Sequence, residues 1–208
     1  TGGMVNQGTI IADGTNAIII DPKALGFVNE GTMQATGSGG FVFSPGAFTN
    51  TGQTIDIPTG SKLDLSNNVT IEGGTLQTTG TGVVNANGSG VGLTFSNVTN
   101  EGNVVQSNND DSNFINSFTN NGTWQLNSAG SFTDMTFTDT VTLGGTGSVQ
   151  MTDFVTNRIL TDNTVMTHGA DHTIQGAGSL LAKTGGKSKP GTIIADRTNA
   201  ICIDQNGL

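Results

Sequence analysis

The sequence predicts an all-β fold, a right-handed parallel β-helix (β-solenoid) of roughly nine coils with about 20–23 residues in each. Composition is the first observation behind this prediction: the 208 residues include 32 Gly, 33 Thr and 22 Asn, no Tyr, and only 11% charged residues. Thr, Val, Ile and Phe favour strands, whereas the helix formers Leu, Lys, Glu and Arg are scarce. The composition is therefore typical of β structure with turns marked by glycine.

A short repeat is the second observation. An apolar residue, often followed by Asn, then a Gly and a short strand recur along the chain, as in VNQGTIIAD from Val5, VNEGTMQAT from Val28 and FTNNGTWQL from Phe118. Most intervals between successive anchor glycines have about the length of one coil, and these glycines are Gly8, Gly31, Gly52, Gly74, Gly102, Gly122, Gly147, Gly178 and Gly191. A unit of this size cannot bury its own apolar face, but stacked units can.

Alternation of apolar and polar residues within each unit is the third observation, because a strand with one buried face requires it. Stacking of the units predicts one interior column, formed by Ile10, Met33, Leu76, Val104, Trp124, Val149, Leu180 and Ile193. Asparagines two residues before an anchor glycine are predicted to form a hydrogen-bonded ladder at one corner: Asn29, Asn50, Asn100 and Asn120. The anchor glycines are expected to supply positive φ at the next corner.

A second, longer repeat is also present. Residues Gly8–Asp21 read GTIIADGTNAIIID and residues Gly191–Asp204 read GTIIADRTNAICID, so 12 of 14 positions agree at an offset of 183. We interpret residues 1–208 as a single β-solenoid domain, slightly more than one super-repeat with this period, whose second copy begins near residue 188. The simplest source of such a pattern is a long tandem array.

Charge and cysteine content exclude several classes of protein. The net charge is −9 and the sequence pI is near 4.2, so nucleic-acid binding is not expected, because it requires clustered Lys and Arg. No membrane insertion is expected either, since no apolar run reaches the roughly 18 residues of a spanning helix. Cys202 is the only cysteine, which excludes an intramolecular disulfide and a cysteine-based zinc site. The first residues lack the features of a signal peptide, so we expect a removed leader or a start inside a larger protein.

The segments VNQGTIIAD, DPKALGFVNEGTMQAT and HTIQGAGSL resemble the recurring blocks of very large bacterial surface proteins. These are β-strand-repeat proteins of the filamentous-haemagglutinin and autotransporter-adhesin type. The resemblance covers nearly the whole chain and implies a secreted or surface-displayed β-solenoid that acts as a stalk, an adhesin or a matrix fibre. The stretch KTGGKSKP, residues 183–190, departs from the usual Asn-Gln before Gly191 and shortens the last interval between anchor glycines.

The sequence predicts no catalytic, cofactor-binding or metal site, and no cofactor. Asp110 and Asp111, within SNNDDSN, are the weak candidates for a cation because hard cations prefer oxygen ligands, but a solvated loop explains them as well. His168 and His172 lie four positions apart, yet Gly169 between them disfavours a helix, so both are expected in loops.

The predicted function is that of an extracellular or cell-surface structural or adhesive protein, a stalk or a filament-forming subunit rather than an enzyme. Neither terminus shows a polar cap, so the expected partners are further copies stacked on the solenoid ends, or covalent tandem repeats. The alternative is a carbohydrate-binding or polysaccharide-degrading β-helix with surface glycans as partners. Scattered carboxylates, among them Asp56 and Asp64 on adjacent predicted strands, would permit glycoside hydrolysis only at a suitable separation.

Overall fold

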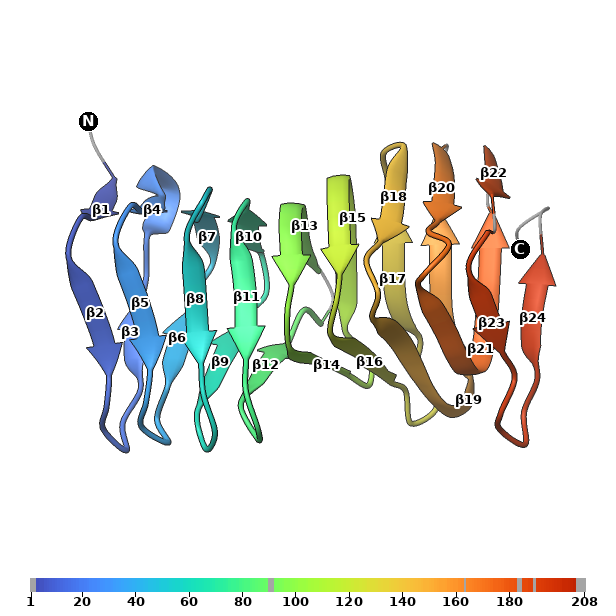
Figure 1. Ribbon diagram of the computed structural model, residues 1–208, viewed down its shortest axis with the longest axis horizontal. Helices are drawn as coiled ribbons and strands as arrows, with labels where there is room; N and C mark the ends of the chain where they lie inside the picture. Colours follow the sequence, from blue (N-terminus) through green and yellow to red (C-terminus); the bar gives the residue numbers. More distant parts are fainter. Residues whose placement is uncertain (1–2, 90–91, 163, 183–184, 189, 205–208) are drawn as a thin grey trace.

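The computed structural model describes residues 3–89, 92–162, 164–182, 185–188 and 190–204. The strands form a single 24-stranded sheet in which neighbouring strands pair in parallel. The chain winds as a β-solenoid of about eight turns, close to the roughly nine predicted. In Figure 1 it descends on the near side, ascends on the far side and advances from left to right, which is the predicted right-handed winding.

Three faces surround the core, and each layer contributes a strand or part of a strand to every face. Face I consists of β1 (Met4–Asn6), β4 (Phe27–Asn29), β7 (Gly46–Thr49), β10 (Val69–Glu72), the first parts of β13 (Leu93–Asn100) and β15 (Asp111–Asn120), β17 (Thr133–Phe137), the last parts of β19 (Ser148–Thr161) and β21 (Thr173–Ala182), and β24 (Ile201–Asp204). Face II consists of β2 (Thr9–Ala12), β5 (Thr32–Ala35), β8 (Thr54–Ile57), β11 (Thr75–Thr78), the last parts of β13 and β15, β18 (Val141–Gly144), β20 (Thr164–His168) and β22 (Gly185–Ser188). Face III consists of β3 (Ile18–Ile20), β6 (Phe41–Phe43), β9 (Lys62–Leu65), β12 (Val83–Ala86), β14 (Asn103–Ser107), β16 (Thr123–Asn127), the first parts of β19 and β21, and β23 (Thr192–Ile194). One turn of 3-10 helix, η1 (Lys23–Leu25), interrupts the strands.

The prediction of one interior column is wrong, because its members lie on three faces. Ile10, Met33 and Leu76 share a column on face II, Val104, Trp124, Val149 and Ile193 share one on face III, and Leu180 lies on face I beside Ile159. Ile55, which follows the anchor Gly52, completes the column on face II, and Ile174, which has no anchor motif in front of it, completes the column on face III. The predicted stacking of apolar residues is therefore confirmed, but not their assignment to one row.

The error arises where the anchor motif moves to another corner. Gly8 and Gly31 precede strands of face II, whereas Gly102 and Gly122 precede strands of face III. In the layer of β13 the chain passes the earlier corner at Asn97, which adopts a φ of 55° without a glycine. The next glycine-anchored motif therefore belongs to the following corner, and an alignment by motif places the strands after Gly102, Gly122 and Gly147 one face too early.

The asparagine ladder exists, but as two stacks. In the first, Asn6 Nδ2 donates to Asn29 Oδ1 at 2.8 Å, and Asn29 Nδ2 donates to Asn50 Oδ1 at 2.8 Å. In the second, at the corner between faces II and III, Asn100 Nδ2 donates to Asn120 Oδ1 at 2.8 Å. All five side chains are buried and have no access to water. Each amide therefore takes a hydrogen-bond partner from the adjacent layer instead of from solvent.

Close packing of layers, more than positive φ, explains the anchor glycines. Gly52, Gly74 and Gly178 have positive φ as predicted, but Gly31 and Gly122 do not. A Cβ at Gly31 would overlap the carbonyl oxygen of Gly8, and one at Gly122 would overlap that of Gly102. Glycine is thus required at these two positions because successive corners approach each other too closely for any side chain.

We expect Asn29→Ala to destabilise the fold markedly. It removes the acceptor of the Asn6 amide and the donor to the Asn50 carbonyl oxygen, and each buried polar group left without a partner costs about 1–3 kcal/mol. Urea denaturation measures the free energy of unfolding. Asn16→Ala at an exposed asparagine is the matched control, with an expected change within about 0.5 kcal/mol. Equal effects of the two substitutions would contradict a stabilising ladder.

Candidate functional site

The two copies of the long repeat lie at opposite ends of the solenoid (Figure 1). We call residues Gly8–Asp21 the first junction segment and residues Gly191–Asp204 the second junction segment. The first contains β2 and β3, which pair with β5 and β6 of the following layer. The second contains β23 and β24, which pair with β21 of the preceding layer. Each segment is therefore paired along one edge only within the described chain.

The junction segments also supply the partly covered ends of the core. The hydrophobic residues that are only partly buried against the core are Ile10 and Ile18 at one end, and Ile193 and Ile201 at the other. In the alignment of the two repeat copies, Ile10 corresponds to Ile193 and Ile18 to Ile201. Beside them, Ile203 is 50% exposed, although the corresponding Ile20 in the first junction segment is buried. Equivalent isoleucines at the two ends are thus covered by a neighbouring layer on one side only within the described chain.

The two junction segments occupy different faces. In the first, β2 lies on face II and β3 on face III, paired with β5 and β6. In the second, the equivalent strands β23 and β24 lie on faces III and I, because they pair with the first and last parts of β21. The sequence of the repeat is thus kept, while its position around the axis advances by one face.

His168 is the last residue of β20, so the expectation of a loop is wrong for this residue, whereas His172 lies in the loop before β21 as expected. The two side chains are buried side by side. Both are completely buried, and His168 Nε2 lies 3.0 Å from His172 Nδ1. His172 Nε2 lies 2.9 Å from Asn120 Nδ2, although the two residues are 52 positions apart. The imidazoles therefore extend the second asparagine stack.

Glycines make this contact possible. The layer between Asn120 and His172 has Gly145 and Gly147 at this corner, and a Cβ at either would overlap the carbonyl oxygen of Asn120. Asn120 Oδ1 already accepts from Asn100, and its Nδ2 is a donor, so His172 Nε2 must accept. The His172 proton then lies on Nδ1 and points to His168. Burial, together with the charge of His168, lowers the pKa of His172 to about 4.

Asp110 is a buried turn residue rather than part of a solvated loop. Its Oδ2 accepts a hydrogen bond from the backbone N–H of Ser107 at 3.1 Å, and burial raises its pKa to about 6. Asp111 pairs across the sheet with Asp134, which forms an ion pair with Arg158. Burial, followed by the charge of Asp134, raises the pKa of Asp111. These carboxylates thus belong to the layer-to-layer packing of face I.

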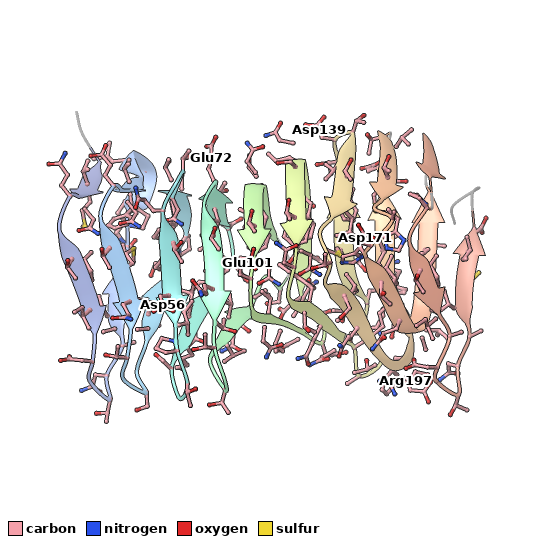
Figure 2. The ribbon with its side chains drawn as sticks, in the orientation of Figure 1. Asp56, Glu72, Glu101, Asp139, Asp171 and Arg197 are labelled. Atoms are coloured by element: carbon pink, nitrogen blue, oxygen red, sulfur yellow. The ribbon has the colours of Figure 1, made fainter. Side chains whose placement is uncertain are left out.

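The two carboxylates expected on adjacent strands, Asp56 and Asp64, lie on different faces. Asp56 lies on face II, where Gln34 Nε2 donates to it at 2.7 Å, and Asp64 lies on face III, where Lys62 Nζ is 2.6 Å away. The two residues are therefore not brought together. Figure 2 shows the labelled carboxylates in separate layers along the middle part of the rod. Among the described residues, no group of three or more His, Cys, Asp or Glu side chains could hold a metal ion.

A polar groove of about 180 Å³ lies near the second junction segment, and its lining residues are Gln125, Asn127, Gln150, Met151, Thr152 and Arg197. Gln125 and Gln150 are paired in register on face III. Their described hydrogen bonds use the amide nitrogens, which donate to Asn103 Oδ1 and Ser148 Oγ, so the carbonyl oxygens can accept from a ligand. The groove therefore combines hydrogen-bond acceptors with one guanidinium group.

The loop that carries Arg197 is fixed by its neighbour Asn199. The backbone N–H of Asn199 donates to Asp153 Oδ1 at 2.8 Å, and its Nδ2 donates to the Asp153 carbonyl oxygen at 2.9 Å. Arg197 lies at the lower edge of the last layers in Figure 2, and its Nε is 3.9 Å from Asp196 Oδ1. The first junction segment has Gly14 at this position, one of only two differences between the segments. The replacement of Gly14 by Arg197 is the one feature of the sequence that marks the groove, although nothing in the sequence alone connects it with a binding site.

Comparisons of the chain with protein-family models, with curated proteins and with solved structures find no match. Among the described residues, no helix has the length and apolar character needed to cross a membrane. The geometry of the junction segments, the buried histidines and the groove therefore carries the functional inference.

We expect the buried His172 to make the fold sensitive to mild acid. Its pKa is about 4 in the folded chain and about 6.5 when unfolded, so the unfolded state binds more protons between these values. Stability is therefore lost as the pH falls from about 6.5 towards 4, by at most about 1.4 kcal/mol per pH unit.

The measurement compares urea denaturation of the natural chain and of His172→Gln from pH 7 to pH 4.5. The glutamine can still accept from Asn120, and its pH dependence is expected to be shallower. Asp110, whose raised pKa acts in the opposite sense over part of this range, is present in both proteins, so the difference between them isolates His172. Identical pH dependence in the two proteins would rule out this assignment.

Proposed function

We propose that this protein is an extracellular structural or adhesive protein whose solenoid units continue end to end as a stalk or fibre. The observation that carries the proposal is the equivalence of the two chain regions at the ends of the solenoid. The partly covered core residues Ile10 and Ile18 correspond to Ile193 and Ile201, and each set is packed from the opposite side. The chain therefore contains a layer that fits one edge of the junction segment and another layer that fits its opposite edge.

The strand pairings identify those neighbours. Along one edge, the first junction segment pairs with β5 and β6 through Met33 and Phe41. Along the other edge, the second junction segment pairs with β21 through Ile174 and Leu180. Since the two segments differ at only two positions, one segment can be covered on both sides within a longer rod. Such an end-to-end contact is heterologous and does not close, which is the geometry of a fibre.

The resemblance to bacterial β-strand-repeat surface proteins supports the same role. A rod of stacked layers needs neither disulfides nor a cofactor, which suits a chain with one cysteine. Its negative net charge of −9 favours solubility of the separate rods.

The polar groove at Arg197 favours a second candidate function, binding of an acidic glycan. A guanidinium group recognises a carboxylate through paired hydrogen bonds, and the Gln125 and Gln150 oxygens can accept from sugar hydroxyls. Eight phenylalanines and Trp124 are buried in the core, and only Phe132 and Phe154 among the aromatic residues are exposed. Recognition by charge and hydrogen bonds is thus better supported than stacking of sugars on aromatic rings.

An extended variant tests the main proposal. In it, residues 22–204 follow Asp204 once more, which reproduces the natural Asp21–Pro22 connection because Asp204 corresponds to Asp21. We expect negative-stain images of a single straight rod, about twice as long and of unchanged width, because each added layer stacks axially on the one before it. Ile193→Asp in the same variant is the control and should introduce a bend or a break. Two separately tumbling rods without that substitution would contradict the proposal.

Substitution of Arg197 tests the second candidate. Trigalacturonate should bind more tightly than its methyl ester by about two- to fivefold, since a guanidinium–carboxylate contact at this exposed position contributes up to about 1 kcal/mol. Arg197→Gly, which installs the residue found at position 14, should abolish the preference without unfolding the loop. Isothermal titration calorimetry at low salt measures both affinities. Equal affinity for the acid and the ester in the natural chain would exclude acidic-glycan recognition in this groove.

A further inference from the structure

From the positions of the two junction segments we infer that successive super-repeats are rotated by one face, a third of a turn, about the solenoid axis. This inference rests on the proposed end-to-end continuation and specifies the interface between copies. Its partner is a second copy of this chain. The starting observation is that β2 lies on face II, whereas the equivalent β23 lies on face III.

All strands of the repeat that the structure describes at both ends shift in the same sense. In the same alignment of the repeat copies, β3 on face III corresponds to β24 on face I. Likewise, β1 on face I overlaps with β22 on face II. Three strands that move together by one face indicate a rotation of the whole repeat and not a local slip of one strand.

The core columns join across such a junction. Ile193 ends the face III column that contains Trp124, Val149 and Ile174. Its equivalent Ile10 begins the column that continues through Met33. In a longer rod these two columns become one, because Ile193 is the last residue of the first column and also occupies the place of Ile10, the first residue of the second.

The exposed edge of the second junction segment is therefore the docking surface for the layer that follows. Because Cys202 corresponds to Ile19, and Ile19 pairs with Val42, Val42 of the next copy should lie directly beside Cys202. Without rotation, Val42 would remain on face III and pair with Ile194 instead, since Ile194 continues the column of Gln175, Gln150 and Gln125. The two arrangements thus place Val42 beside different residues.

The only cysteine of the chain makes the rotation testable in the extended variant. Paired residues on adjacent parallel strands are about 4.8 Å apart, which lies within the range that a disulfide spans. The first variant keeps Cys202 and carries Val42→Cys in the added copy. The matched variant carries Cys202→Ile, Ile194→Cys and the same Val42→Cys. In both, Cys202 of the added copy is replaced by Ile, the residue at position 19.

Mild oxidation of the folded proteins, followed by mass spectrometry of the linked peptides, gives the readout. A third of a turn predicts rapid and nearly complete linkage in the first variant and at least tenfold slower linkage in the matched variant. Faster linkage through position 194 would overturn the rotation while leaving the continuous rod intact. Comparable slow linkage in both, with two separate rods in negative stain, would overturn the end-to-end proposal itself.

Discussion

Hydrogen bonding between parallel layers is the constraint on which the whole molecule depends. Each layer completes its backbone hydrogen bonds only through the layers before and after it, so the fold has no closed unit smaller than the stack. This requirement fixes the register of every side chain along the axis. Buried amides such as Asn29 and Asn50 can therefore bond from layer to layer, and the aromatic core can form continuous columns.

The fold class, the stacking of apolar residues and the existence of an asparagine ladder could be predicted from the sequence, because each repeats with the period of one layer. The corner to which a motif belongs could not. The same Asn-x-Gly pattern at Asn29 and at Asn100 serves two different corners, since Asn97 turns the chain at one corner without a glycine. One such replacement moves the motifs at Gly102, Gly122 and Gly147 by a face, which is why Met33 and Trp124 are in separate columns.

The buried histidines show a second limit of sequence reasoning. Their surroundings depend on Gly145 and Gly147, residues of another layer that leave room for an imidazole to reach Asn120. Spacing within the segment that contains His168 and His172 carries no sign of this. The groove at Arg197 is similar, because its walls come from β16 and β19 while its guanidinium comes from a loop pinned to Asp153. A site whose residues come from different layers can thus be recognised only once the stacking of the layers is known.

The direction of the interlayer hydrogen bonds has a mechanical consequence. They run along the rod, so a pull on its two ends acts on one layer boundary at a time instead of shearing many bonds together. Layers would peel off in sequence and re-form when the tension falls. The contact between Asn120 and His172 spans an intervening layer, so two boundaries are tied together there. A rod built in this way would yield gradually under tension, one layer boundary after another.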